Sequence, residues 1–230
     1  MAEPGARTSC ERLRLTPQAI LARLVPFVLE LESRAQGRVA IGLAGGPGSG
    51  KSTLAAELVT LLNAENPARA ALVPMDGFHM KHARLEAMGQ TDRKGAPHTF
   101  EAADFVNFLH RIRSATEPVS GPLYSRKIED TVEDAFTIPP DVRVLVVEGN
   151  YLLLTDGPWA GVKPLLDYAI FLDLPRELAK ARLLRRHAEE GLFTEARNRA
   201  HVDRNDLPNF DLCRQSRHRA DLVIELDVER

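Results

Sequence analysis

The residues with the clearest chemical capacity lie in the stretch GLAGGPGSGKSTLAAEL, Gly42 to Leu58. Five glycines fall among residues 42–50, and a lysine and two hydroxyl side chains follow them. The stretch fits the pattern G-x-x-x-x-G-K-[ST], in which glycines let backbone N–H groups approach phosphate oxygens without obstruction by side chains. The lysine then meets the outer phosphates, and the serine hydroxyl suits Mg²⁺, so the sequence predicts a site for a nucleoside triphosphate. The predicted nucleotide-binding residues are Gly45, Gly46, Pro47, Gly48, Ser49, Gly50, Lys51, Ser52 and Thr53.

Two acidic residues each follow an apolar run that is typical of a buried strand. Asp76 follows ALVPM, and Glu148 follows VRVLVV. Because ligands of open α/β sheets bind at the carboxyl ends of the strands, both acids are expected beside the phosphate loop. Asp76 can accept the proton of a substrate hydroxyl or bind Mg²⁺, and Glu148 can orient metal-bound water. The metal-site prediction therefore comprises Ser52, Asp76 and Glu148.

Three classes of protein use such a phosphate loop: small-molecule kinases, GTPase switches, and ATPase motors or regulators. The chain contains no Asn-Lys-x-Asp segment, which argues against a guanine-specific GTPase. An ATPase motor often carries a second acid after the strand, whereas Gly149 follows Glu148 here. These features favour a kinase.

A basic segment later in the chain can act on the same phosphates. Residues 176–219 contain eleven Lys and Arg against seven Asp and Glu. Arg182 lies three residues before Arg185 and four before Arg186, so it shares a helix face with each of them. A positive helix facing a phosphate site can stabilise the charge on a transferring phosphoryl group. Nucleic-acid binding is a weaker interpretation, because Phe193 and Phe210 are the only aromatic residues in this segment.

Strand and helix patterns alternate along the chain, as expected where helices cross over between parallel strands. Thr16 and Pro17 predict a helix start, and Gly37 predicts its end. The stretch from about Lys81 to Pro140 reads as largely irregular and is expected to have a functional role. Strands are predicted at 39–43, 70–75, 142–147, 169–172 and 222–226. Further helices are predicted at 51–63, 102–112, 176–190 and 194–202.

Composition limits the remaining possibilities. The 230 residues are 44% hydrophobic and 27% charged, with a net charge of −2, which favours one α/β domain over residues 1–230. Cys10 and Cys213 are too few and too far apart in sequence to form a disulfide framework. No apolar run approaches the ~18 residues of a membrane span, and the first residues lack a secretory pattern. We therefore expect a cytoplasmic protein with no membrane or nucleic-acid partner, and a homodimer is compatible with the sequence.

Several segments together resemble the family of uridine kinase, phosphoribulokinase and pantothenate kinase. They are GGPGSGKST, MDGFHM, RKGAPHTFEAADF, LYSRKIEDTVEDAFTIP, VVEGNYLLL and RLLRRHAEEGL. The resemblance extends from about Val39 to Val223 and is strongest to a bacterial branch described as nucleoside or nucleotide kinase-like, or as kinases linked to fructose transport. It implies a P-loop NTPase fold, with a mostly parallel sheet flanked by helices, an N-terminal helix within residues 1–37 and a small helical lid at about 176–204.

The resemblance also implies roles for particular residues. Asp76 matches the proposed base, Glu148 the acid near the metal, and Arg182, Arg185 and Arg186 the arginines of the lid helix. Two more groups match regions beside the acceptor: Tyr124 with Arg126, and Arg93 with His98. His79, His98 and His187 are further candidates for contact with substrate or adenine, and Trp159 is either a pocket residue or a packing residue.

The sequence thus predicts an ATP-dependent phosphotransferase that uses Mg²⁺ and passes the γ-phosphoryl group to an alcohol of a small metabolite. Asp76, Lys51, Arg182 and Arg186 are its predicted catalytic residues. The acceptor stays open among sugars, nucleosides and pantothenate-like alcohols. A nucleotide-binding regulator or slow ATPase, with the acceptor pocket as a sensor, is the alternative.

Overall fold

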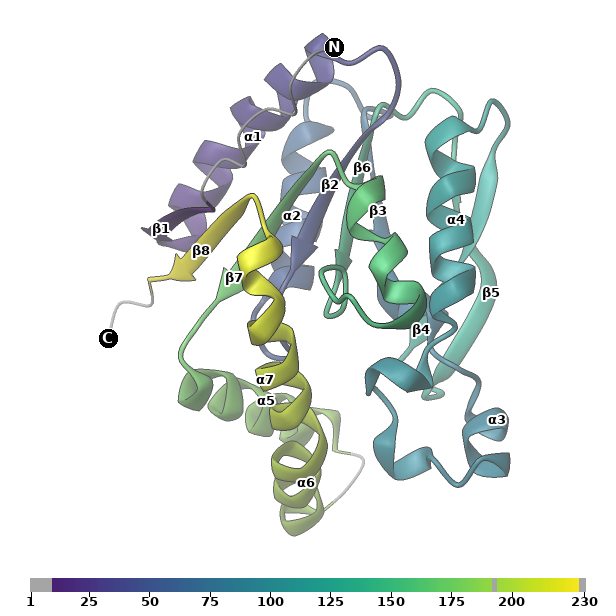
Figure 1. The fold of residues 1–230 in the computed structure, drawn as a ribbon, viewed down its shortest axis with the longest axis vertical. Helices are drawn as coiled ribbons and strands as arrows, with labels where there is room; N and C mark the ends of the chain where they lie inside the picture. The colour runs from purple at the N-terminus through teal and green to yellow at the C-terminus, as the bar shows by residue number, and fades with distance from the viewer. Residues whose placement is uncertain (1–9, 192–193, 228–230) are drawn as a thin grey trace.

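A six-stranded, all-parallel sheet forms the centre of the structure, a computed structural model that describes residues 10–191 and 194–227 (Figure 1). The strand order is β1-β8-β7-β2-β6-β3, and a separate antiparallel pair, β4-β5, lies beside it. The predicted α/β fold class with a mostly parallel sheet is confirmed. The strands are β1 (Glu11–Leu15), β2 (Val39–Ala44), β3 (Ala70–Pro74), β4 (Val119–Ser125), β5 (Asp130–Ile138), β6 (Val144–Gly149), β7 (Tyr168–Asp173) and β8 (Leu222–Leu226).

Helices connect the strands. Thr16 accepts a hydrogen bond from Ala19 N (3.3 Å) and caps the first helix, which therefore begins at Pro17 as the sequence predicts. The helices are α1 (Pro17–Arg34), α2 (Lys51–Leu62), α3 (His82–Ala87), α4 (Ala102–Ser114), α5 (Arg176–Glu190), α6 (Glu195–His201) and α7 (Leu207–Gln215). A π-helical segment, Val202–Asp206, joins α6 to α7, and a 3₁₀ turn, Met75–Phe78, follows β3.

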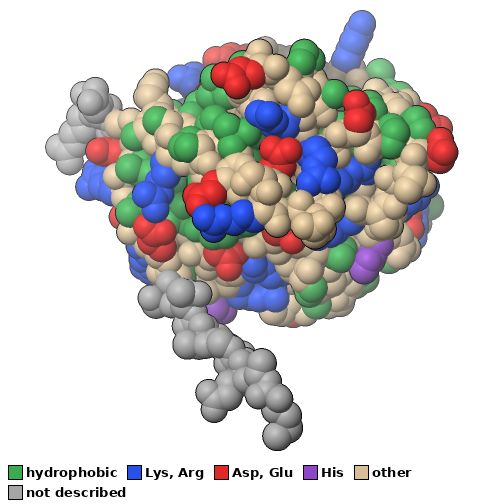
Figure 2. Space-filling model, turned by 90° about the horizontal axis from the view of Figure 1, so that it is seen from above, with side chains coloured by type: hydrophobic (Ala, Val, Ile, Leu, Met, Phe, Trp, Pro, Cys, Tyr) green, Lys and Arg blue, Asp and Glu red, His purple; other side chains and the backbone are tan. Residues whose placement is uncertain are grey.

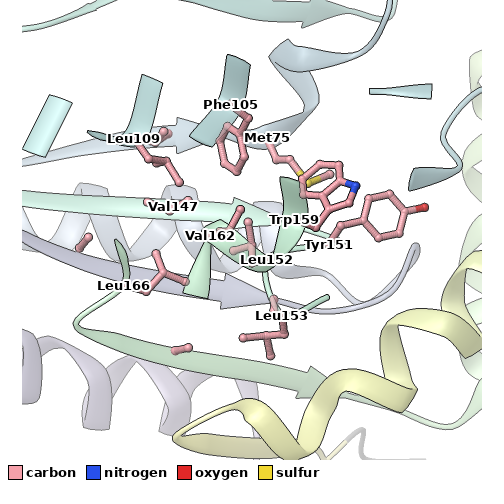
Figure 3. Packing of buried hydrophobic residues seen from close by; sticks show 14 of the residues in the cluster. Met75, Phe105, Leu109, Val147, Tyr151, Leu152, Leu153, Trp159, Val162 and Leu166 are labelled. Carbon is pink, nitrogen blue, oxygen red and sulfur yellow. The ribbon is translucent and has the colours of Figure 1, made fainter. Parts of the chain in front are cut away.

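Both faces of the central strands are buried, because the side chains that alternate toward the two faces of the sheet are apolar in both directions. On one face, Ile41 and Val146 pack with residues of α1 and α2. On the other, Val147 packs with α4 and with the segment 151–166 (Figure 3). Trp159 belongs to this second core, where it is 4% exposed and donates from Nε1 to Pro97 O (3.2 Å). Its role in the structure is therefore packing.

The largest error of the sequence analysis concerns the stretch from Lys81 to Pro140. It contains α3 and the hairpin β4-β5, besides the predicted helix that became α4. Gly121 and Pro122 lie inside β4, with a register shift beside them, and such residues normally argue against a strand. The hairpin tolerates them because it has only two strands. β1 and α7 were also missed, and the first helix ends at Arg34 instead of reaching Gly37.

The face at the amino ends of the strands carries interspersed basic and acidic side chains (Figure 2). Ion pairs at this end of the sheet include Arg69 with Glu32 (3.5 Å) and Arg113 with Asp167 (2.8 Å). These contacts join the connecting segments at this end of the sheet. Among the described residues, no helix has both the length and the apolar character that a bilayer crossing requires.

Candidate active site

A cleft of about 1090 Å³ opens at the carboxyl ends of the strands, between the phosphate loop, the 91–95 loop, the hairpin and the helices α5 to α7. Ten of the predicted site residues line it. They are Pro47, Lys51, Ser52, Asp76, His79, Arg93, Tyr124, Arg126, Arg186 and His187. The parallel register explains this convergence, because β2, β6 and β3 all end at the same edge of the sheet.

The phosphate loop joins β2 to α2 through two glycines in the left-handed region, Gly48 (φ 77°) and Gly50 (φ 88°). Its conformation is fixed partly by packing inside the protein. A Cβ at Gly46 would lie 2.5 Å from the ring of Phe210, on α7. Glycine at position 46 is therefore required by packing within the protein, and not only by the room that phosphates need.

Lys51, Ser52 and Glu148 form the polar centre of this edge. Ser52 Oγ donates to Glu148 Oε2 (3.0 Å), and Glu148 lies in β6 between Leu43 and Pro74 of the neighbouring strands. Glu148 is 4% exposed. Burial raises the pKa of its carboxyl group, while the Lys51 ammonium acts in the opposite direction and Asp76 adds to the rise. This carboxylate would be stabilised by a cation bound next to Ser52.

Asp76 lies in the 3₁₀ turn directly after β3 and is partly exposed to the cleft. Its backbone oxygen accepts from His79 Nδ1 (2.8 Å). Because a carbonyl can only accept, Nδ1 carries the proton and Nε2 is left as an acceptor in the neutral ring. Burial lowers the pKa of His79, which favours this neutral form. The His79 ring packs against the rings of Phe100 and Tyr124, with ring centres 4.0 Å and 4.7 Å away, and these contacts fix its orientation.

The residues predicted beside the acceptor divide into two groups. Tyr124, Arg126 and Arg93 line the cleft, and Arg126 is paired with Glu190 of α5. His98 does not line it: its side chain is exposed and Nε2 lies 3.1 Å from Gln90 Oε1. The structure therefore places His98 outside the cleft, because the 3₁₀ turn Pro97–Thr99 directs Thr99 inward instead.

The arginines of α5 also point in different directions. Arg182 donates to Ser49 O in the phosphate loop (3.4 Å). Burial lowers the pKa of Arg182, and the positive charge of Arg185 lowers it further. Arg186 lines the cleft, and its Nε is buried without a hydrogen-bond partner. Arg185 is exposed and pairs with Glu189 on the same helix (3.8 Å). Arg182 and Arg186 thus lie at the phosphate loop and the cleft, whereas Arg185 does not.

The sequence analysis missed the contacts between the 91–95 loop and the helices that follow α5. Asn205 Nδ2 donates to Lys94 O (2.7 Å), and Asn209 Nδ2 donates to Gly95 O (3.3 Å). In the opposite direction, Arg93 donates to Arg204 O (3.0 Å). The polar run RNDLPN at 204–209 was the available signal.

His187, on α5, lines the cleft. Its Nε2 is 2.9 Å from Asp206 Oδ2, and its Nδ1 is 3.3 Å from Glu190 Oε2. His201 lies close enough that His187, His201 and Asp206 offer three potential metal-ligand atoms within 4.8 Å of one another. The π-helical segment explains this approach, because residues five apart share a face there but not in an α-helix. These contacts hold α5 against α6.

Comparison with known proteins identifies the family. The model of the Phosphoribulokinase / Uridine kinase family matches residues 40–227. The chain belongs to this family. It is 36% identical over 197 residues to the "Putative uridine kinase C227.14" of Schizosaccharomyces pombe, with 83% of this chain and 84% of that protein covered.

Two further relatives agree with this assignment. A Pantothenate kinase of Latilactobacillus sakei is 32% identical over 148 residues, which cover 64% of this chain and 48% of that protein. The crystal structure of a "putative fructose transport system kinase" from Silicibacter sp. TM1040 superposes with a TM-score of 0.81 at 38% identity, covering 88% of this chain and 98% of that one. The protein is thus a small-molecule kinase with a P-loop fold.

Proposed function

We propose that this kinase transfers the γ-phosphoryl group of ATP, bound with Mg²⁺, to an alcohol group of a small metabolite. One observation carries the proposal. Ser52, at the start of α2, donates a hydrogen bond to the buried Glu148 of β6, and Asp76, after the neighbouring strand β3, faces the same cleft. The catalytic roles below belong to this proposal.

The residues of the phosphate loop fit a bound nucleotide. Ser49 Oγ is buried without a hydrogen-bond partner, and the Lys51 side chain makes no hydrogen bond among the described residues. Residues 45–53 would hold the phosphates, with Lys51 facing the outermost one. Ser52, Glu148 and Asp76 supply the oxygen ligands that Mg²⁺ prefers. When bound, Mg²⁺ would neutralise charge on the β- and γ-phosphates.

Asp76 is the proposed base. Its carboxylate makes no hydrogen bond among the described residues and is therefore available to a substrate hydroxyl. As the acceptor oxygen bonds to the γ-phosphorus, the bond to the bridging oxygen of ADP breaks and the hydroxyl proton passes to Asp76. Arg182 and Arg186 would stabilise the charge that spreads over the transferring group.

The test is a coupled assay of ADP release with sugars, polyols, nucleosides, hydroxy acids and vitamins as acceptors. We expect at least one alcohol to raise ADP release far above the rate with ATP alone, with the phosphorylated product found by mass spectrometry. A regulator or slow ATPase would give a low rate that no alcohol increases. That outcome across the whole panel contradicts the proposal.

A further inference from the structure

Lys94 is a half-buried cation in the wall of the cleft, and no carboxylate of the described residues contacts its ammonium group. Its Nζ donates to the backbone oxygen of Glu129 and lies 5.1 Å from the centre of the Tyr124 ring. Burial lowers its pKa, and the carboxylates of Asp130 and Glu129 act in the opposite direction from beyond ion-pair distance. A carbonyl and an aromatic face stabilise an ammonium group less than a contacting anion does.

Arg93, the neighbouring residue, is in the same situation. Its guanidinium donates to Arg204 O (3.0 Å), and no carboxylate of the described residues pairs with it. Two other cations of the cleft, Arg126 and Arg186, differ because both pair with Glu190. Two adjacent cations of the 91–95 loop therefore face the cleft with only carbonyl partners.

The acids of the cleft do not fill this role. Glu190 is used by the arginines and by His187, and Asp206 by His187. Glu86 faces His82 (3.6 Å). Asp92 and Glu129 also line the cleft, but neither contacts Lys94 through its carboxylate.

The position of Lys94 relative to the proposed base points to the acceptor. Lys94 Nζ lies over the Tyr124 ring, Tyr124 packs against His79, and His79 Nδ1 donates to the backbone oxygen of Asp76 (2.8 Å). The centres of the His79 and Tyr124 rings are 4.7 Å apart, with the ring planes tilted by 41°. Asp76 and Lys94 thus line the same cleft and are linked through the two aromatic rings.

On the basis of the function proposed above, we infer that the acceptor is an anionic alcohol, whose carboxylate or phosphate binds Lys94 and Arg93 while its hydroxyl faces Asp76. Hydroxy acids and sugar phosphates share this chemistry. A cation held in place by Glu129 O and Tyr124 needs little rearrangement to bind such a group.

The test compares matched neutral and anionic alcohols: glycerol with glycerate, and fructose with fructose 6-phosphate. The first pair probes a carboxylate and the second a phosphate. Turnover is measured by ADP release, and binding by calorimetry on enzyme loaded with a non-hydrolysable ATP analogue. We expect the anionic member of at least one pair to bind and react at least about tenfold better, as one charge-assisted hydrogen bond allows.

Variants of Lys94 locate the effect. Lys94→Met, which keeps the length and removes the charge, should weaken binding of the anionic alcohol by about 10- to 100-fold. Lys94→Arg should retain part of the affinity. Affinity for the neutral partner and for ATP should stay within about twofold. Lys127→Met is the matched control, since Lys127 is exposed on the same hairpin and does not line the cleft.

Four outcomes overturn the inference. They are equal or better use of the neutral alcohols, no calorimetric binding of any anionic probe, an equal loss for both members of a pair in Lys94→Met, and a selective loss of ATP affinity in that variant. The first of these leaves the proposed kinase reaction intact. In contrast, anionic probes that bind through Lys94 while no alcohol stimulates ADP release would reject the proposed function and keep the binding site.

Discussion

Replacement of Glu148 by glutamine tests whether the carboxylate beside the phosphate loop is as desolvated as its position indicates. The side chain is 4% exposed and accepts a hydrogen bond from Ser52 Oγ, and the amide oxygen of glutamine can accept the same bond in place of the carboxylate. Glu148→Gln thus removes one ionisable group with little change in shape. We expect this variant to become more stable relative to the wild type as the pH rises.

The magnitude follows from the shift in pKa. Burial raises the pKa of Glu148 from 4.5 to about 7, with Lys51 opposing the rise. At roughly 1.4 kcal/mol per pH unit, this difference corresponds to about 3 kcal/mol. Because the folded-state pKa is raised, the contribution to stability is fully present below pH ~4.5 and is lost as the pH rises through about 7.

Thermal unfolding of both proteins without Mg²⁺ or nucleotide, at about pH 5 and about pH 8.5, measures this effect. Between these conditions the difference in unfolding free energy should change by about 2–3 kcal/mol in favour of the variant. For a chain of this size, the gap in Tm should widen by about 5–10 °C. Glu57→Gln, on the exposed face of α2, controls for the loss of one negative charge. If the two Tm values change in parallel with pH, the assignment of a desolvated carboxylate is wrong.

Three further predictions concern turnover. Lys51→Ala should keep the wild-type Tm and lose about 10³-fold or more in kcat, because a charge facing the transferring phosphate is removed; unchanged kcat would contradict the assignment of the loop. Asp76→Asn should lower kcat by roughly 10² or more while ATP affinity, from a nucleotide titration, stays within about tenfold. Arg186→Ala should reduce kcat more than ATP binding, whereas Arg185→Ala should leave both near wild type, since Arg185 is exposed and directed toward Glu189; equal effects in steady-state kinetics would refute the difference in roles.

Periodicity and capping residues were sufficient to predict most of the sheet and its helices. α5 and β8 have the predicted bounds, β2, α2 and β3 differ by one residue at their last residue, and β7 differs by one residue at each end. These elements are regular and their apolar residues repeat at the expected spacing. The hairpin β4-β5 does not follow such a pattern, because Gly121 and Pro122 interrupt the first strand and charged residues occupy the second.

The site could be predicted where a residue follows directly from a strand end or the phosphate loop. Asp76, Ser52 and Glu148 meet at one edge because the register of parallel strands brings their ends together. Spacing along the helix could not predict that Arg182 contacts the phosphate loop while Arg185 is exposed, since the direction of each side chain depends on how α5 packs. Lys94 was missed because its burial arises from the hairpin. The single-domain organisation, the cytoplasmic location and the oligomeric state stay predictions.

The contact between Gly46 and Phe210 has a consequence for synthesis of the protein on the ribosome. The phosphate loop joins β2 to α2 in the first quarter of the chain. The side chain that packs against it, Phe210, belongs to α7, which is translated much later. A nascent chain that ends before α7 has the loop sequence without the surface that supports its conformation. We therefore expect nucleotide to have little stabilising effect during most of translation, and to act only once α7 has emerged and docked.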